Sequence, residues 1–421
     1  MTYTQSNTSQ NGGIYGRPGF GNLFARVPFA QSSLIEFGPT RSYQLGLVSD
    51  PTSEIDFQTQ RAFPFVKLGV TERGLRAPNA NLNDAFNQSN KFTLRTSRDL
   101  WEGANLDLNW SLTVDYSRNM ALKTDSLGRA EVQSTATSGA LEKSFLSFPP
   151  IFIFSIFNSG IGQVGKDYNK LRDNLQDTRS EEEKISEAFE SGFESLPILS
   201  KILGEFAPKL NYSLRWGGLE KIPLLQEYVS NLSLDHVYQS TYRKSYKGNL
   251  SGGRIIEGQR LQYGFSPLLG MNVTFKEILK GNMNANFRYN TQTAFDLVPA
   301  ARNISENSME EISVTGGFSR SGFEIPLFGV SFSNDIDISF TYSYSHNSRQ
   351  TFEINSISEK GIPGEGSSRT QFEPRIRYVL SARVNASFFY RYTKIAPDEG
   401  GSRIPGSTTN EGGLDISVAI R

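Results

Sequence analysis

Long stretches of the chain alternate strictly between apolar and polar residues. Between residues 106 and 117 every even position is Leu, Trp, Val or Tyr, and every odd position is Asp, Asn, Ser or Thr. The same alternation returns at 282–290 and 335–344. Period two is typical of a β-strand whose two faces meet different surroundings. The pattern therefore predicts an all-β fold, with further strands at 269–275, 372–380, 384–392 and 414–420 and weaker candidates near 41–48, 90–98, 209–216, 230–243 and 310–320.

Two environments produce such alternation. A soluble antiparallel sheet turns one face to a core and the other to water, whereas an outer-membrane barrel turns one face to lipid and the other to an aqueous lumen. A tilted membrane strand needs about 9–11 residues, and several of the predicted strands have this length. The sequence therefore favours an antiparallel transmembrane β-barrel.

The lengths of the predicted connections support the barrel. Short connections at 276–282 and 381–383 alternate with long, polar connections at 291–309, 346–367 and 394–412. Bacterial barrels have short periplasmic turns and long extracellular loops. Counting the strands through to the end predicts a protein of the outer membrane with a periplasmic C-terminus.

Parity assigns side chains to the two faces of the predicted strands. The predicted lipid-facing residues are Leu108, Trp110, Leu112, Phe287, Ile338, Phe340, Ile376 and Phe388. The predicted lumen-facing residues are Arg288, Asp337, Arg375, Arg377, Arg383 and Arg391. A three-residue turn would set Arg377 opposite Arg383, and because facing like charges are destabilising, we expect a lumen filled with water.

Other segments lack the alternation. The predicted organisation is an irregular segment at 1–40, barrel strands at 41–157, an extracellular insertion at 158–207, and C-terminal barrel strands at 208–421. In the insertion, Ile185, Phe189, Phe193 and Leu196 form a helical stripe behind an acidic start. Apolar clusters containing proline at 217–229 and 321–333 are expected on the periplasmic side as plug-like segments.

Composition excludes several classes of protein. No run approaches the roughly 18 apolar residues of a spanning helix, and the mean hydropathy is −0.40. The 421 residues include no cysteine and two histidines, which excludes thiolate metal sites and disulfides. Equal numbers of basic and acidic residues, 43 each, argue against binding of nucleic acid. The 30 Phe and 17 Tyr residues argue against disorder.

The candidates for catalytic chemistry are weak. Residues 160–165 spell GxGxxG, but no alternation of strands and helices surrounds them as a dinucleotide site would require. His236 shares a parity with apolar residues and is interpreted as a histidine near the membrane rim, and His346 as a loop histidine. We therefore expect no enzyme, no cofactor and no metal or catalytic residues.

Several short strings in the second half of the chain carry more specific information. They are GLEKIPL at 218–224, LDHVYQSTY at 234–242, SPLLGMNVT at 266–274, SGFEIP at 321–326, FEPRIRY at 372–378 and TTNEGGLD at 408–415. In this order, over about 206–421, the chain resembles the C-terminal part of the SprA (Sov) family, the outer-membrane translocon of the type 9 secretion system.

The resemblance implies a function. In that family a single very large barrel conducts folded cargo proteins with C-terminal sorting domains, including adhesins of gliding motility. The resemblance implies that this chain is a segment of such a very large outer-membrane barrel. Periplasmic plug and lateral-gate proteins and outer-membrane lipid are the implied partners, and no catalytic residues are implied. Two alternatives stay open, a self-contained porin or small-molecule transporter and a soluble β-rich surface adhesin. Because the first 40 residues contain no signal peptide, Met1 is expected not to be the native start.

The face assignment predicts the effects of arginine substitutions. Arginine on the lipid face costs about 2–4 kcal/mol at mid-membrane, so Phe340→Arg and Leu112→Arg should impair assembly. The neighbouring Ser339→Arg and Thr113→Arg should be mild. Heat-modifiability after outer-membrane extraction measures this, and equal behaviour of all four variants would contradict the assignment.

Overall fold

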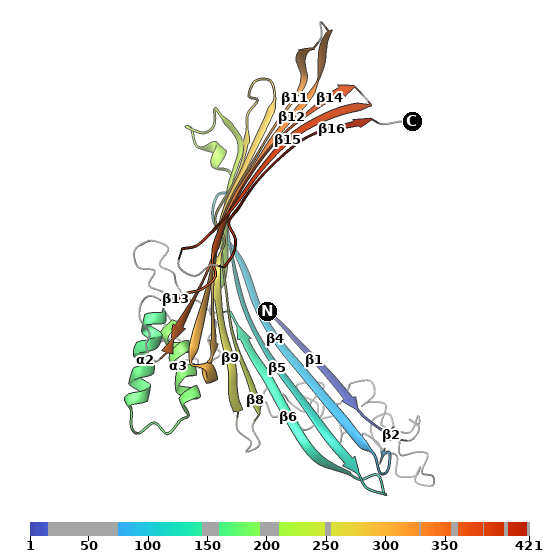
Figure 1. Ribbon diagram of the computed structural model, residues 1–421, viewed down its shortest axis with the longest axis vertical. Helices are drawn as coiled ribbons and strands as arrows, with labels where there is room; N and C mark the ends of the chain where they lie inside the picture. Colours follow the sequence, from blue (N-terminus) through green and yellow to red (C-terminus); the bar gives the residue numbers. More distant parts are fainter. Residues whose placement is uncertain are drawn as a thin grey trace. The chain divides into compact units, whose positions relative to one another are not determined.

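The computed structural model describes most of the chain as long antiparallel strands with two α-helices (Figure 1). The described residues are 1–15, 75–144, 160–193, 210–248, 254–327, 330–354, 361–381, 383–399 and 403–418. The strands are β1 (Thr2–Asn11), β2 (Ile14–Tyr15), β3 (Leu75–Arg76), β4 (Asn81–Trp101), β5 (Ala104–Thr124), β6 (Ala130–Lys143), β7 (Asn211–Trp216), β8 (Val229–Gly248), β9 (Arg254–Phe275), β10 (Asn282–Val298), β11 (Asn303–Leu327), β12 (Val330–Glu353), β13 (Ile362–Pro363), β14 (Ser367–Ser381), β15 (Val384–Pro397) and β16 (Ser407–Val418).

Within the described residues, fourteen strands belong to one sheet. Their order is β1-β4-β5-β6-β8-β9-β10-β11-β12-β14-β15-β16, while β7 pairs with β5 and β8, and β13 pairs with β12. Strands β2 and β3 form a separate pair. Strands that follow one another in the chain lie side by side because short connections favour antiparallel neighbours. The all-β, antiparallel prediction is confirmed.

Close contacts divide the chain into two compact units. Unit 1 comprises Met1–Thr93, Ser111–Glu142 and Arg243–Glu257, and unit 2 comprises Leu94–Trp110, Lys143–Tyr242 and Gly258–Arg421.

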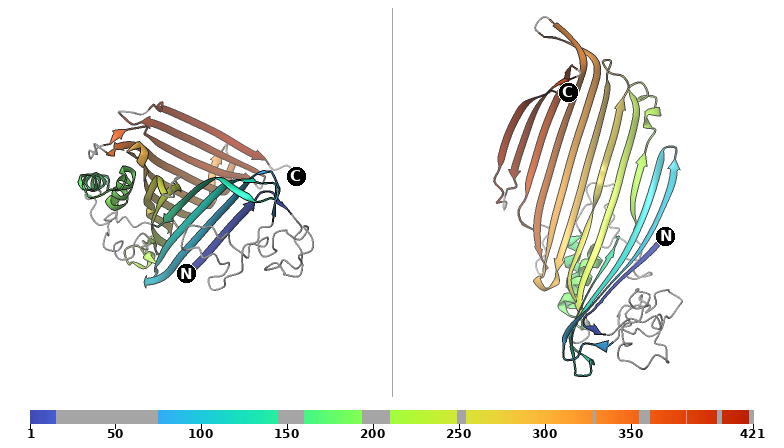
Figure 2. Two further views of the ribbon diagram at one scale, coloured as in Figure 1. Left: turned by 90° about the horizontal axis from the view of Figure 1, so that it is seen from below. Right: turned by 90° about the vertical axis from the view of Figure 1, so that its right-hand side faces the viewer.

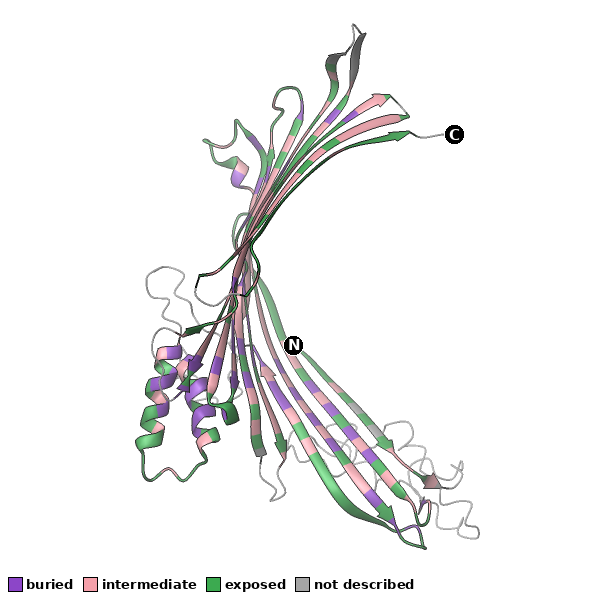
Figure 3. Ribbon diagram, viewed as in Figure 1, coloured by how far each residue is buried: buried purple, intermediate pink, exposed green. Residues whose placement is uncertain are grey.

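Unit 1 has a buried face with an alternating pattern, visible along β4 and β5 in Figure 3. Phe86 and Tyr116 are buried there with their ring centroids 6.3 Å apart. The buried pair Arg76–Asp84, at 2.6 Å, ties β3 to β4. Because both charges are buried, each needs the other to offset its desolvation.

The predicted irregular segment at 1–40 is partly wrong. Thr2–Asn11 is strand β1, paired with β4 from Thr2 opposite Thr93 to Asn11 opposite Asp84. Its composition gave no signal because Tyr3 is its only large apolar side chain, and backbone pairing supplies the stabilisation instead. Residues 16–40 lie outside the described part of the chain, as does the weak strand candidate at 41–48.

The strands of unit 2 are far longer than their alternating stretches. β11 has 25 residues and β12 has 24, paired from Asn303 opposite Glu353 to Leu327 opposite Val330. The predicted long connection at 291–309 is therefore wrong, because β10 and β11 are joined by the single turn η5 (Pro299–Ala301). His346 is likewise not in a loop but inside β12.

The two predicted plug-like segments have different structures. Residues 321–327 belong to β11 and residues 330–333 to β12, and Phe323 pairs with Asn334, so this prediction is wrong. Residues 217–229 do contain an ordered non-strand element, the 3₁₀ turn η4 (Leu219–Lys221), with Leu219 buried. A plug role for 217–229 stays a prediction.

The segment at 217–229 is anchored to the turn between β4 and β5. Lys221 Nζ lies 2.5 Å from Glu102 Oε1, and this hydrogen bond lowers the pKa of the exposed Glu102 carboxyl. Leu219 and Val229 pack with Leu232 and Val273 of the sheet. The segment is therefore held at both its ends.

The insertion at 158–207 contains two helices, α2 (Ile161–Asp173) and α3 (Glu181–Phe193). The predicted stripe residues Ile185, Phe189 and Phe193 are buried in α3, and Leu196 lies outside the described residues. Helix α2 was not predicted, because its start is the glycine-rich GxGxxG string. The helices cross closely there, since a Cβ on Gly192 would lie 2.6 Å from the Val164 nitrogen.

The turn between the two helices is ordered by charge. Arg179 is hydrogen-bonded to both Asp177 and Glu187. The Arg179 guanidinium lowers the pKa of the Asp177 carboxyl to about 2. The two helices thus form a closed hairpin, visible as the pair α2 and α3 in Figure 1.

Phe189 should be the main anchor of this helical hairpin. Its side chain is fully buried, and a buried Phe→Ala change costs about 3–5 kcal/mol. In Phe189→Ala we expect much faster proteolysis at the turn around Leu175, measured by limited digestion of the protein folded in detergent. Glu182→Ala, at an exposed position of the same helix, is the matched control. Equal digestion rates for the two variants would contradict the anchor role.

Candidate functional site: the two faces of the sheet

A row of apolar side chains crosses four neighbouring strands of unit 2. Ile338 of β12 lies opposite Ile376 of β14, which lies opposite Phe388 of β15, which lies opposite Leu414 of β16. Their exposed fractions are 38%, 42%, 53% and 64%. Figure 2 shows these strands side by side. Large apolar groups aligned by register form a continuous exposed patch, which marks an interaction surface.

The apolar face extends over a limited number of residues along each strand. On β12 the apolar positions run from Ile336 to Tyr344, and the next position on that face is His346. On β15 they run from Val384 to Tyr392 and are followed by Lys394. Each stretch is about as long as the 9–11 residues with which a tilted strand crosses a bilayer. Tyrosines at the end of a spanning strand are typical of the aromatic girdle.

The opposite face of the same strands is charged. Glu373 lies between two guanidinium groups, with Arg391 at 2.8 Å and Arg375 at 3.3 Å. Arg391 also contacts Glu411 at 3.2 Å, and Arg375 lies over the ring of Phe389. We call Glu373, Arg375, Arg391 and Glu411 the charged ladder. Its members stay partly exposed, so the face suits contact with water rather than a dry core.

A second ion pair and a hollow adjoin the charged ladder. Arg377 lies 4.0 Å from Asp337 on the neighbouring strand β12. Both residues line a hollow of about 510 Å³ together with Glu277, Lys280 and Asp335. The lining includes three acidic and three basic side chains, so the hollow has no strong preference for either sign of charge.

The register places most predicted lumen residues on this charged face, but one pairing differs. Arg377 lies opposite Ser387, not Arg383, because Val379 pairs with Asn385 and the register continues without a break from there to Arg377. Arg383 instead occupies the β14–β15 turn, where it is exposed. The predicted opposition of like charges is thus wrong. Arg288 is exposed on β10, on the parity of this face.

The predicted lipid-facing residues fall into two groups. Ile338, Phe340, Ile376 and Phe388 are exposed on the apolar face of unit 2, whereas Leu108, Trp110 and Phe287 are half-buried. Leu112 lies in unit 1 and is only 4% exposed, so its side chain is buried. Arginine at Leu112 would therefore be costly through burial of a charge.

A second apolar zone lies farther along the same face of β10–β12. After Tyr289, β10 carries Thr291 and Thr293 and then Phe295 and Leu297. Phe295 and Leu297 are buried under the helical hairpin, and the rings of Phe193 and Phe295 are 4.5 Å apart. Figure 1 shows α2 and α3 beside these strand ends. Sequence reasoning missed this zone because a polar gap separates it from the first.

Polar side chains also fix α3 on the sheet. Lys143 of β6 binds Glu190 at 2.7 Å, and the hydroxyl of Tyr242 donates to the same carboxylate at 3.2 Å. Gln259 Nε2 donates to the Tyr242 hydroxyl and to the Ser186 carbonyl. Because Lys143 is only 5% exposed, removing Glu190 would leave a buried cation, which is strongly destabilising.

His236 is a structural residue among aromatic rings. Its Nδ1 lies 2.6 Å from the Leu268 carbonyl and its Nε2 lies 3.2 Å from the Tyr212 hydroxyl. Its ring packs on Tyr212 and Phe265. Within the described residues, no group of three or more His, Cys, Asp or Glu side chains could hold a metal ion.

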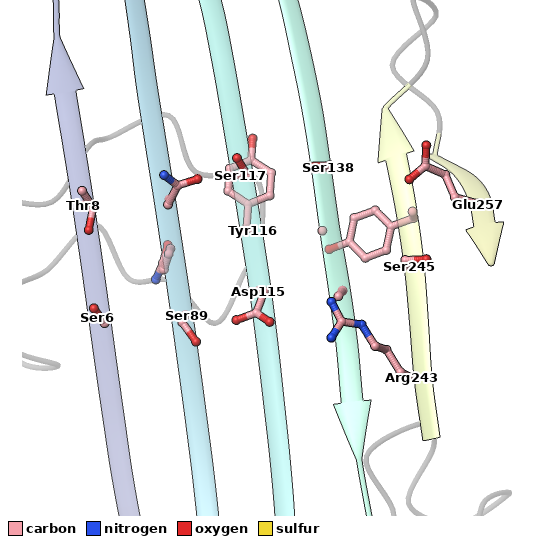
Figure 4. Close-up of a pocket in the computed structure, with 15 residues that line it drawn as sticks. Ser6, Thr8, Ser89, Asp115, Tyr116, Ser117, Ser138, Arg243, Ser245 and Glu257 are labelled. Atoms are coloured by element: carbon pink, nitrogen blue, oxygen red, sulfur yellow. The ribbon is translucent and has the colours of Figure 1, made fainter. Parts of the chain in front are cut away.

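Unit 1 carries a polar hollow of about 450 Å³ (Figure 4). Hydroxyl, amide and charged side chains dominate its lining, among them Ser6, Thr8, Asn87, Ser89, Asp115, Ser117, Ser138, Arg243, Ser245 and Glu257. Asp115 and Ser117, at odd positions of β5, contribute polar side chains to this lining.

Neither α2 nor α3, the α-helices that the structure describes, has the length and hydropathy of a membrane span.

Comparisons with known proteins yield little. No family model and no curated protein matches the chain. Among solved structures, the β domain of the Bordetella autotransporter Brka is similar, with 10% identity over 80% of this chain and 92% of that one. The TM-score is 0.23, a value too low to establish a shared fold.

Charge reversal at Glu373 tests the charged ladder. Glu373→Lys would place three cations side by side, so we expect a loss of roughly 1 kcal/mol in the free energy of unfolding at low salt. Because exposed charges are screened, 0.5 M NaCl should restore most of it, measured by denaturant unfolding in detergent.

Asp335→Lys is the matched control, because no ion pair of Asp335 is found among the described residues. A destabilisation of Glu373→Lys that does not respond to salt, or an equal effect in the control, would contradict the ladder.

Proposed function

We propose that the chain forms part of the wall of an outer-membrane β-barrel that conducts proteins. One observation carries the proposal: a row of exposed apolar side chains and the charged ladder lie on opposite faces of the same strands, β14–β16, and the apolar row continues onto β12. Apolar-out and polar-in alternation is the arrangement of a membrane barrel. The apolar face would meet lipid and the charged face an aqueous lumen.

The geometry of the strand ends supports the orientation. The β9–β10, β11–β12 and β14–β15 turns are short and share one end of unit 2 with the last residues of β16. The opposite end carries the longer β12–β14 and β15–β16 connections. Short turns are periplasmic in bacterial barrels. The proposal therefore has a periplasmic C-terminal end and an extracellular helical hairpin.

Conduction of proteins, rather than of small solutes, rests on the resemblance to the SprA (Sov) translocons. Under that proposal the cargo carries C-terminal sorting domains, and periplasmic plug and lateral-gate proteins are the partners. The charged face fits such a lumen because its ion pairs are partly exposed and balanced in sign. A passing protein would meet a hydrated surface that binds neither acidic nor basic side chains strongly. No catalytic group, cofactor or metal has a part in the proposal.

Cysteine labelling tests the two faces, because the chain has no cysteine of its own. In cells, Ser339→Cys and Thr341→Cys on the polar parity of β12 should react with a membrane-impermeant maleimide. Ile338→Cys and Phe340→Cys on the apolar parity should be protected by lipid, which excludes the charged reagent. Equal labelling of both pairs would support the soluble adhesin and refute the membrane placement.

The same variants separate a protein channel from a porin. With a stalled cargo protein that bears a single cysteine, Ser339→Cys should form a disulfide cross-link, whereas Phe340→Cys should not. Correct labelling of the faces without any cross-link, together with a conductance that admits only small solutes, would favour the porin.

A further inference from the structure

Strand β16 has a hydrogen-bonded neighbour on one side only within the described residues. It pairs with β15 from Ser407 opposite Ile395 to Val418 opposite Val384, and the sheet order ends there. Figure 2 shows it at the margin of the strands of unit 2. In the part of the chain that the structure describes, no strand pairs with its other edge. Such an edge in lipid is not viable without a partner strand.

The edge of β16 lacks most of the features that normally prevent pairing. Natural edge strands are protected by proline, charged side chains (lysine above all), bulges or short length. β16 is 12 residues long, contains neither proline nor lysine, and follows β15 without a register shift. On its apolar face Leu414, Ile416 and Val418 are 58–64% exposed, more than Ile376 inside the sheet. The edge is therefore suited to accept another strand.

The charges of β16 define the strand that would fit. Its ionisable side chains, Glu411 and Asp415, are both acidic. Glu411 is paired with Arg391, whereas Asp415 lies opposite the neutral Ser387 and has no ion pair among the described residues. A cation directly opposite Asp415 would stabilise the pairing, and another acid would destabilise it.

We infer that the free edge of β16 binds an amphipathic β-strand with an apolar residue at every second position and a Lys or Arg across from Asp415. Strand β1, the other end of the sheet order, does not fit this description, because Tyr3 is its only large apolar residue and it has no basic residue. A second copy of β16 does not fit either, because two acidic strands would meet. The inference deepens the proposed function by specifying the next strand of the wall.

Synthetic peptides test the inference on the full chain folded in detergent micelles. The probe is an 11-residue strand of alternating Val and Thr with Lys at the central polar position, and its twin has Glu there. Fluorescence anisotropy should show saturable binding of the Lys peptide and about fivefold weaker binding of the Glu peptide. Asp415→Lys should invert this preference, and Asp415→Asn should abolish it.

Asp335→Lys is the control, because Asp335 lies on β12 inside the sheet and its charge should not alter the preference. Absence of saturable binding, or a preference that survives in Asp415→Lys, would overturn the inference. Concentration-dependent dimers of the unmodified chain in sedimentation would also overturn it, in favour of a second copy. Peptide binding in micelles requires no transport, so it fails or succeeds independently of the cysteine labelling that tests the proposed function.

Discussion

Backbone hydrogen bonding between antiparallel strands is the interaction on which the rest of this structure depends. Side chains alternate with period two, so a slip of one residue would turn every apolar group to the other face. The unbroken register from Ile338 through Ile376 to Phe388 is what gathers scattered residues into one apolar row. The same register brings Glu373 between Arg375 and Arg391 on the opposite face. Both faces are therefore consequences of a single pairing pattern.

The sequence predicted the existence and the faces of the central strands but not their ends. Alternation at 335–344 lies within β12, yet β12 continues to Glu353. Past Tyr344 polar residues occupy both parities, as at His346, and hydropathy then carries no signal, although backbone pairing continues. For the same reason β1, whose only large apolar side chain is Tyr3, has no strand signal in its hydropathy. Hydropathy indicates whether the faces of a strand meet apolar or aqueous surroundings, whereas backbone hydrogen bonding determines the length of the strand.

Features that depend on pairing partners could not be predicted. A one-residue irregularity interrupts the pairing of β14 with β15 between Val379 and Ser381, and the sequence has no marker for it. Phe193 contacts Phe295 across about a hundred residues of chain. The helical stripe of α3 predicted that Phe193 would be buried. The stripe does not indicate which other part of the chain packs against Phe193. Hydropathy patterns indicate which side chains are buried, whereas the order and register of the strands determine which residues they contact.

The two apolar zones on one face of β10 explain why the chain needs its helical hairpin. The first zone ends at Tyr289, and in the proposed placement lipid covers it. The second zone, at Phe295 and Leu297, lies beyond the length of a membrane strand, where water would meet it. Covering it with α3 removes this apolar surface from water, which stabilises the long strand ends. The buried Lys143–Glu190 pair adds little net stability of its own, but it favours the helix orientation that brings Glu190 to the lysine.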